Sequence, residues 1–246
     1  TNAGNWPDVP YDAYCKDGAA VLAVEGALRG GAGAVRYVGG AADAVIAAHP
    51  ETLVHPGPPD RAGRVQAWVV GPGLGDEPGV AEVLASDVPV LVDADGLRGL
   101  DPALVRARSA PTVLTPHAGE AAALLDTTRE EVEAGRLAAV RELAGRYGAT
   151  VLLKGSTTLV CGAAAGAVRV NPTGTGWLAT AGSGDVLSGL AGSLLAAGLH
   201  PVDAASCAAY LHGLAARRAS EGRGPVTAGE VAGTLGEAWR DVRAGE

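Results

Sequence analysis

A glycine-rich loop that ends in a carboxylate lies within Asn171–Gly189, and an apolar run with helical spacing follows it at once. Successive backbone N–H groups in such a loop can close around phosphate oxygens, and the free N–H groups of a new helix add a positive dipole end. Asp185 would lie beside that phosphate, where it could take a proton from a hydroxyl group. An anion cradle beside a base is the arrangement that phosphoryl transfer requires. The alternative is a flexible loop that caps a helix, with Asp185 as a first-turn charge.

Asp185 is expected to be ionised at neutral pH, because the helix dipole and neighbouring amides favour the charged carboxylate. A second polar stretch, Lys154–Thr158, leaves the end of a predicted strand and enters a hairpin. A lysine there can reach a phosphate as a point charge, and the glycine and hydroxyl groups offer further donors. The alternative is an ordinary polar turn with a solvated lysine.

Further polar residues stand where predicted strands end. Glu120 could hold magnesium through water, and His117 could contact a ligand. The alternative makes Pro116 the first residue of a helix and Glu120 a first-turn partner of its dipole. Of Asp93 and Asp95, one could cap a turn while the other faces the ligand.

Short apolar runs alternate with helical ones from Val65 onward, and strands joined by helices in this way indicate a mostly parallel sheet covered on both faces. In such sheets ligands bind beyond the carboxyl ends of the strands, where all of these polar motifs fall. The predicted strands are Gln66–Val70, Val88–Val92, Thr112–Leu114 and Thr150–Leu153, and the predicted helices between them are Val80–Leu84, Ala121–Leu125 and a long one over Arg129–Tyr147.

The remaining elements follow the same reasoning, and no internal repeat or clear domain linker is found. A hairpin is expected from Thr157–Cys161 and Ala167–Val170, then helices over Asp185–Ala197, Asp203–Arg218 and Thr227–Val242. Before Val65, the expected elements are a helix at Ala19–Leu28, a strand at Ala34–Val38 and a loop at His55–Asp60, whereas Thr1–Asp17 is polar and proline-punctuated.

Composition narrows the function classes. The net charge of -8 argues against a nucleic-acid or anionic-membrane surface, since both reward clustered Lys and Arg. Three widely spaced cysteines form neither a disulfide framework nor a metal-ligand pattern, which is typical of a reducing compartment. No long apolar run or signal-peptide pattern occurs, so a cytoplasmic protein is expected.

Five motifs, in order, resemble one family, the nucleotide-dependent NAD(P)H-hydrate dehydratases of the ribokinase-like superfamily. The resemblance covers about Ala19 to the C-terminus. It implies a three-layer α/β/α sandwich with a mostly parallel central sheet, as one domain over residues 18–246 behind an N-terminal segment of residues 1–17. The motifs are Val-Val-Gly-Pro-Gly-Leu-Gly75, Val-Asp-Ala-Asp-Gly-Leu97, Leu-Thr-Pro-His-Ala-Gly-Glu120, Leu-Lys-Gly-Ser-Thr-Thr158 and Leu-Ala-Thr-Ala-Gly-Ser-Gly-Asp-Val-Leu-Ser-Gly189.

The resemblance also implies an activity, the repair of (6S)-hydrated NADH and NADPH with ADP or ATP and Mg²⁺. Hydroxide leaves the hydrated ring badly, whereas a phosphorylated hydroxyl leaves well. Superfamily members often self-associate, so a homo-oligomer is expected, and an epimerase domain could be fused or act as a partner.

By the same resemblance, Asp185 is the catalytic base. The anion hole is Gly182, Ser183 and Gly184; the nucleotide-binding positions are Lys154, Gly155, Ser156, Thr157, Thr158 and Gly184; and the positions facing the hydrated dinucleotide are Ala19, Gly73, His117 and Asp185.

The chain departs from the family pattern in two places. Ala118 stands where the family usually has proline. The family also has a first strand and a Gly-Ser loop before the segment that matches Gly18–Ala20, but here Tyr14–Asp17 precedes that segment and no strand is predicted. Two other functions therefore stay open: a ribokinase-like kinase for a vitamin-precursor alcohol, and a degenerate, inactive nucleotide-binding domain.

Overall fold

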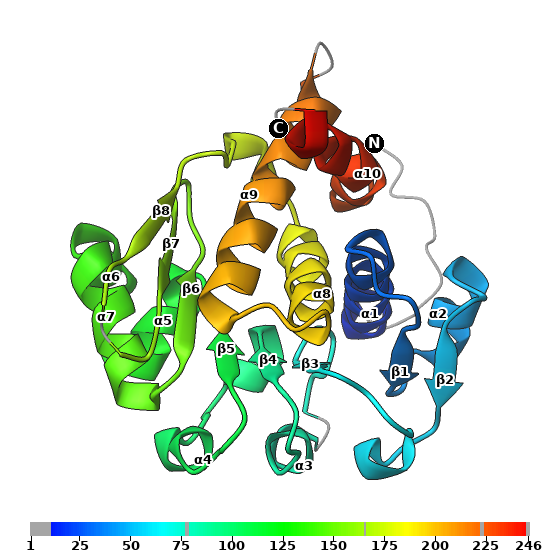
Figure 1. The fold of residues 1–246 in the computed structure, drawn as a ribbon, viewed down its shortest axis with the longest axis horizontal. Helices are drawn as coiled ribbons and strands as arrows, with labels where there is room; N and C mark the ends of the chain where they lie inside the picture. Colours follow the sequence, from blue (N-terminus) through cyan, green and yellow to red (C-terminus); the bar gives the residue numbers. More distant parts are fainter. Residues whose placement is uncertain (1–10, 77–78, 165, 222–223, 245–246) are drawn as a thin grey trace, which may run out of the picture.

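The fold is a three-layer α/β/α sandwich, seen in a computed structural model that describes residues 11–76, 79–164, 166–221 and 224–244 (Figure 1). Its main sheet has six strands in the order β3-β4-β5-β6-β7-β8. The first four are mutually parallel, and the last two are antiparallel to their neighbours. These strands are β3 (Trp68–Val70), β4 (Val90–Val92), β5 (Thr112–Leu114), β6 (Thr150–Leu153), β7 (Thr158–Cys161) and β8 (Arg169–Asn171).

Helices cover both faces of this sheet, and the strand side chains alternate between them. Val90 and Val92 belong to the core under α3 to α7, whereas Leu91 between them packs with α8, α9 and α10. This alternation follows from the two-residue period of a strand. The first layer consists of α3 (Val80–Leu84), α4 (Pro102–Arg106), α5 (Ala118–Leu125), α6 (Arg129–Ala134) and α7 (Arg136–Tyr147), and the second of α8 (Ser183–Ala196), α9 (Pro201–Ser220) and α10 (Ala228–Ala244).

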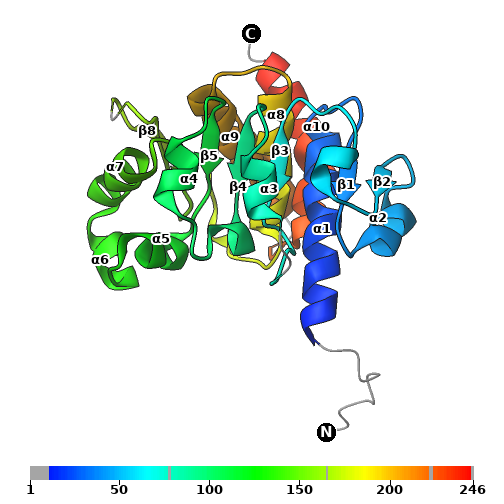
Figure 2. The same ribbon diagram turned by 90° about the horizontal axis from the view of Figure 1, so that it is seen from below.

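The predicted fold class is confirmed, and so are the four predicted parallel strands and the hairpin of β7 and β8. The sheet is not continuous, however. β1 (Arg36–Val38), which the sequence predicts, pairs in parallel with β2 (Leu53–His55), which it does not, and these two form a separate sheet. Figure 2 shows this pair beside α1 (Tyr11–Arg29) and α2 (Ala42–Ala48), apart from β3.

The single long helix predicted over Arg129–Tyr147 is wrong, because the chain breaks it at Gly135. Gly135 has φ -126° and ψ 39°, outside the helical region, and it ends α6 and precedes α7. Thr128 and Glu131 form a capping box that starts α6 as a helix of its own. The consequence for the site is that α7 starts at Arg136, whose side chain reaches the turn after β6.

Helix α1 is continuous through the predicted boundary between Asp17 and Gly18, and residues 1–10 of the predicted N-terminal segment lie outside the described residues. The helix packs closely on α8, since a Cβ atom built on Gly189 would lie 1.9 Å from the carbonyl oxygen of Ala23. Among the described helices, none combines the length and apolar character that crossing a membrane requires.

Candidate active site at the carboxyl ends of the strands

The glycine-rich loop is fixed in place at the start of α8. Gly182 is its N-cap with φ 86°, a conformation that favours glycine, and a Cβ atom there would lie 2.3 Å from Cδ1 of Leu22 on α1. The Ser183 hydroxyl donates to the carbonyl of Leu178 at 2.7 Å. The first-turn N–H groups of α8 therefore form a fixed positive end, suited to an anion.

Asp185 lies in that first turn and is partly buried. Burial, together with the negative charge of Asp93, raises its pKa to about 7, although Lys154 opposes the shift. The prediction of a carboxylate fully ionised at neutral pH is therefore wrong. The helix dipole is outweighed first by burial of the carboxyl group and then by three further acidic groups from distant loops, Asp93, Asp95 and Glu120. A carboxyl group with a pKa near 7 is a better proton acceptor than an ordinary aspartate.

Lys154 is buried among carboxylates. Its Nζ atom lies 2.6 Å from Oδ1 of Asp93 and 3.8 Å from Oε2 of Glu120. Burial by itself would lower the pKa of Lys154, but these two carboxylates outweigh it, and the pKa is raised. The alternative of a solvated lysine in an ordinary turn is thus wrong. The amine also lies 3.4 Å from the position of a Cβ atom built on Gly184, which puts it next to the loop.

The structure divides the roles of the two aspartates that follow β4. Asp93 is almost fully buried and joins Lys154 to the hydroxyl of Ser188 on α8, which donates to Asp93 Oδ2 at 2.6 Å. Asp95 instead accepts the backbone N–H of Gly75 at 2.8 Å. One aspartate therefore links the sheet to α8, and the other holds the loop that follows β3.

Arg136, which the sequence did not point to, holds the turn from Lys154 to Thr158 through hydrogen bonds to its backbone. Its Nη2 atom donates to the carbonyls of Leu153, Lys154 and Thr157 at 3.3, 3.1 and 3.2 Å. Of the predicted nucleotide-binding residues in this turn, Gly155 and Ser156 are exposed, and Thr157 and Thr158 are partly buried. No sequence signal marks Arg136, since it is an unremarkable helical arginine until the fold brings it there.

His117 and Glu120 form the start of α5. The backbone N–H groups of Gly119 and Glu120 donate to the ring nitrogen Nδ1 of His117. The backbone N–H of His117 in turn donates to Oε2 of Glu120 at 2.7 Å. The alternative that makes Pro116 the first helical residue is therefore wrong, since His117 is the N-cap and α5 begins at Ala118, whereas Glu120 does lie in the first turn. The ring of His117 remains more than half exposed, so it can still meet a ligand.

The fit of these residues to Mg²⁺ is partial. Among the described residues, no group of three His, Cys, Asp or Glu side chains is arranged to hold a metal directly. Carboxylate oxygens of the kind that Mg²⁺ accepts are nevertheless present on Glu120 and Asp185, and Mg²⁺ commonly keeps several of its waters. The donor set thus fits an ion held mainly through water and nucleotide phosphates.

The residues predicted to face the dinucleotide lie around the same edge. Gly73 has φ 67°, and a Cβ atom there would lie 2.3 Å from the carbonyl oxygen of Lys16, so the loop after β3 touches the first turns of α1. Ala19 lies one turn before Leu22, on the face of α1 that meets Gly182. These positions and Asp185 therefore come from elements that contact one another.

His212 on α9 was given no role by the sequence, yet it lies against the loop. It is buried, and burial lowers its pKa to about 4, while the carbonyl of Ser183 partly opposes this shift. The imidazole is therefore neutral under physiological conditions and packs behind the first turn of α8.

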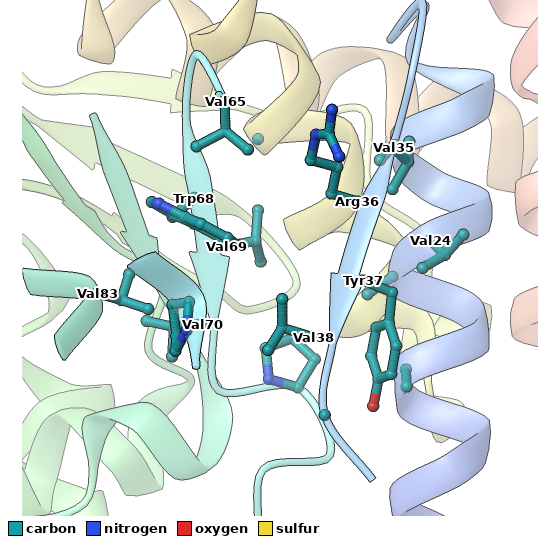
Figure 3. A pocket seen from close by; sticks show the side chains of 18 of the residues that line it. Val24, Val35, Arg36, Tyr37, Val38, Val65, Trp68, Val69, Val70 and Val83 are labelled. Carbon is teal, nitrogen blue, oxygen red and sulfur yellow. The ribbon is translucent and has the colours of Figure 1, made fainter. Parts of the chain in front are cut away.

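A cavity of about 870 Å³ adjoins this edge but does not contain its chemistry. It lies between β1 and β3 (Figure 3) and reaches Gly71 to Leu74 at one end. Asp185, Lys154 and His117 are not among its lining residues. The candidate active site is therefore the surface beyond the strand ends, and the cavity is a separate feature.

Comparison with known proteins gives one consistent result. The family model for NAD(P)H-hydrate dehydratase matches residues 14–236. A protein of Mycobacterium leprae named bifunctional NAD(P)H-hydrate repair enzyme is 50% identical over 214 residues, covering 85% of this chain and 44% of that protein. A protein of Neisseria meningitidis named ADP-dependent (S)-NAD(P)H-hydrate dehydratase is 43% identical, covering 92% of this chain and 80% of that one.

Solved structures agree. The ADP/ATP-dependent NAD(P)H-hydrate dehydratase of Bacillus subtilis, co-crystallised with ATP and Mg²⁺, is similar with a TM-score of 0.82 at 28% identity, covering 92% of this chain and 85% of that one. A ribokinase-like superfamily protein of Enterococcus faecalis has a TM-score of 0.74 at 20% identity, covering 96% and 91% of the two chains, which is a likeness of fold. The chain spans less than half the length of the bifunctional mycobacterial relatives that it matches.

Proposed function

The chain belongs to the NAD(P)H-hydrate dehydratase family, and from this membership we propose that it catalyses the nucleotide-dependent dehydration of (6S)-hydrated NADH and NADPH. The product is the intact dihydronicotinamide. We propose ADP or ATP as the phosphoryl donor and Mg²⁺ as the metal, as the names of the relatives suggest.

One observation supports this proposal above the others: Asp185 has a pKa near 7 and stands in the first turn of the helix that follows the glycine-rich loop. At that pKa about half of the molecules carry the base form near neutral pH, and the conjugate acid is strong enough to return a proton. An aspartate at its usual pKa would be a weaker acceptor for an alcohol proton.

The reaction can be written with these residues in named roles. Asp185 takes the proton of the ring hydroxyl while the oxygen forms a bond to the terminal phosphorus of the nucleotide and the bridging P–O bond breaks. Gly182, Ser183 and Gly184 offer backbone N–H groups to the phosphoryl oxygens in transfer. Loss of phosphate and of a neighbouring ring proton, which passes to water, then restores the double bond.

The nucleotide would lie along the turn from Lys154 to Thr158, with Gly155, Ser156 and Thr157 as its contacts. Because Asp93 holds the amine of Lys154 at 2.6 Å, this lysine acts as a fixed charge beside the loop rather than a mobile one. Mg²⁺, when bound, would neutralise phosphate charge, with Glu120 holding it through water.

The dinucleotide would lie against Ala19, Gly73 and His117. Gly73 lets the backbone approach closely, and the exposed ring of His117 offers Nε2 to a polar group of the substrate. The Nδ1 atom is engaged in the helix cap, so Nε2, which lies 3.5 Å from Oε1 of Glu120, is the ring nitrogen left to meet the substrate.

Further properties follow as proposals from the family. The bifunctional names of relatives about twice as long suggest a second domain with the matching epimerase activity, fused or separate. We propose that the protein self-associates, as members of the ribokinase-like superfamily often do, and that it acts in the cytoplasm.

The direct test is to incubate the protein with hydrated NADH, Mg²⁺ and either ADP or ATP, and to follow the near-ultraviolet absorbance of the dihydronicotinamide. Recovery of that absorbance with stoichiometric release of phosphate supports the proposal. Nucleotide binding without recovery would leave an inactive binding domain. Phosphorylation of a thiazole or pyrimidine alcohol without recovery would favour a small-alcohol kinase.

A further inference from the structure

Two strands face each other across the 870 Å³ cavity without a strand between them. In the part of the chain that the structure describes, β1 pairs only with β2, and β3 pairs only with β4. Both β1 and β3 line the cavity. Figure 3 shows Arg36 and Val65 at one end and Val38 and Val70 at the other, so the two strands run in the same direction.

The backbone groups that point into this slot can be identified from the pairing. The N–H of Trp68 and the carbonyl of Val70 bond to β4, and the carbonyl of Val35 bonds to β2. Because successive residues of a strand turn their backbone groups to opposite edges, those of Val69 and Val38 face the slot. A pair of parallel edges thus presents unpaired donors and acceptors to one space.

Side chains beside the slot are less buried than those of the neighbouring strand. Every residue of β4 is buried, whereas Val38 on β1 and Val69 on β3 are only partly buried. The floor under them is made of small residues of α1 and α8, and its alanines fill less of the slot than larger side chains would. These are Ala20, Ala23, Ala27, Gly189, Gly192 and Ala196.

Charge distinguishes the two ends of the slot. Arg36 and Arg64 both line it at the amino ends of the strands, and neither takes part in an ion pair with any of the described residues. The Arg36 side chain reaches the segment that carries Arg64, since its guanidinium carbon lies 3.4 Å from a Cβ atom built on the preceding residue, Gly63. At the carboxyl end the charged lining residues are Lys16, Asp17 and Glu82, so the excess of positive charge lies at the amino end.

We propose that this slot accepts an extended apolar segment of another polypeptide as a parallel strand that joins β1 to β3. A small apolar ligand would fit the volume but would leave the backbone groups of both edges unpaired, whereas a peptide backbone satisfies both at once. About five residues with branched side chains, spanning ~17 Å, suit the space. Acidic residues at the amino end of the segment would pair with Arg36 and Arg64.

The test uses the full chain and a synthetic acetylated peptide, in which two acidic residues precede five alternating valines and isoleucines. Binding is measured by calorimetry, and amide hydrogen exchange is measured by NMR with and without the peptide. We expect slower exchange at the slot-facing amides of both walls, Arg36 and Val38 on β1 and Ala67 and Val69 on β3. Protection on both walls is what an inserted strand produces and a surface contact does not.

Two matched changes separate backbone pairing from apolar contact. A peptide with the same side chains but N-methylated at alternate backbone nitrogens should bind at least about tenfold more weakly. The substitution Val69→Pro removes one slot-facing N–H, which an edge strand tolerates, and should weaken binding to a similar extent. Its control, Val69→Ala, keeps the N–H and should weaken binding by no more than about threefold.

Four outcomes would overturn the proposal. These are no peptide binding, binding that leaves the amides of either wall unprotected, equal affinity of the N-methylated peptide, and protection of the same amides in the free protein that grows with its concentration. The last result would show that a second copy of this chain fills the slot. The N-methylated peptide needs no protein variant, so the test stands even if Val69→Pro fails to fold.

Discussion

The Nζ atom of Lys154 lies 2.6 Å from the Oδ1 atom of Asp93, although 61 positions separate the two residues in the sequence. Lys154 follows β6 and Asp93 follows β4, so the contact joins the ends of two strands of the parallel sheet. The second oxygen of Asp93 accepts the hydroxyl of Ser188 and extends the link to α8. This bridge sets the charge around Asp185, whose pKa responds to both partners.

Replacing Asp93 by Asn should destabilise the protein, because it removes the nearest carboxylate from the buried amine of Lys154 and leaves that of Glu120 at 3.8 Å. We expect a loss of about 3 kcal/mol in the free energy of unfolding, measured by urea denaturation. The exposed Asp87→Asn is the control and should change stability by less than about 0.5 kcal/mol. Equal stability of the two variants would mean that the buried pair contributes little.

Ser188→Ala should cost about 1–3 kcal/mol of unfolding free energy, because one oxygen of a buried carboxylate loses its donor. Ser206→Ala is the matched control, since that hydroxyl donates to the carbonyl of Val202 in its own helix. Denaturation midpoints that do not differ between the two variants would contradict this role of Ser188.

The raised pKa of Asp185 makes a prediction about stability and pH. Its pKa is raised from 3.8 to about 7 by folding, so its contribution to stability is present below about pH 4 and is lost as the pH rises through 7. Asp185→Asn removes this pH-dependent penalty. The free energy of unfolding of the variant, relative to that of the parent protein, should therefore be higher at pH 8 than at pH 5 by roughly 1–3 kcal/mol, a range reduced to allow for partial solvent access. Parallel stability curves for the two proteins between these pH values would rule out the shift.

Arg136→Ala should loosen the turn that we propose binds the nucleotide, because three carbonyls lose their common donor. Nucleotide affinity, measured by calorimetry, should fall roughly tenfold. Arg129→Ala removes an exposed arginine from the first turn of α6 and serves as the control. Unchanged affinity in Arg136→Ala would show that the turn holds its shape without it, or that the nucleotide binds elsewhere.

Much of this arrangement could be predicted from the sequence, because apolar runs such as that around Val90 are long enough to mark buried parallel strands. Once the strands are placed, the polar residues at their ends must meet at one edge. The position of the candidate base, Asp185, could also be predicted, because the glycine-rich loop that carries it leads directly into a helix.

What the sequence could not give depends on contacts between distant segments. The pKa of Asp185 is set by its burial and then by Asp93, Lys154 and other charged groups, all of which are brought together only by the fold. The role of Arg136 requires that α7 begin beside the turn after β6, and this depends on the break at Gly135. The sequence indicates that the first strand of the family pattern is not predicted in this chain, but it does not indicate the cavity between β1 and β3.

We propose that Asp185 removes the proton of the substrate hydroxyl, and the variant Asp185→Asn tests this role most directly. In the hydrated-NADH assay, turnover by this variant should fall by at least about a hundredfold, although the variant should bind nucleotide as tightly as the parent protein. The activity of the parent protein should rise with pH through a pKa near 7. Turnover by Asp185→Asn at the parent rate, with the same dependence on pH, would show that the base is another group.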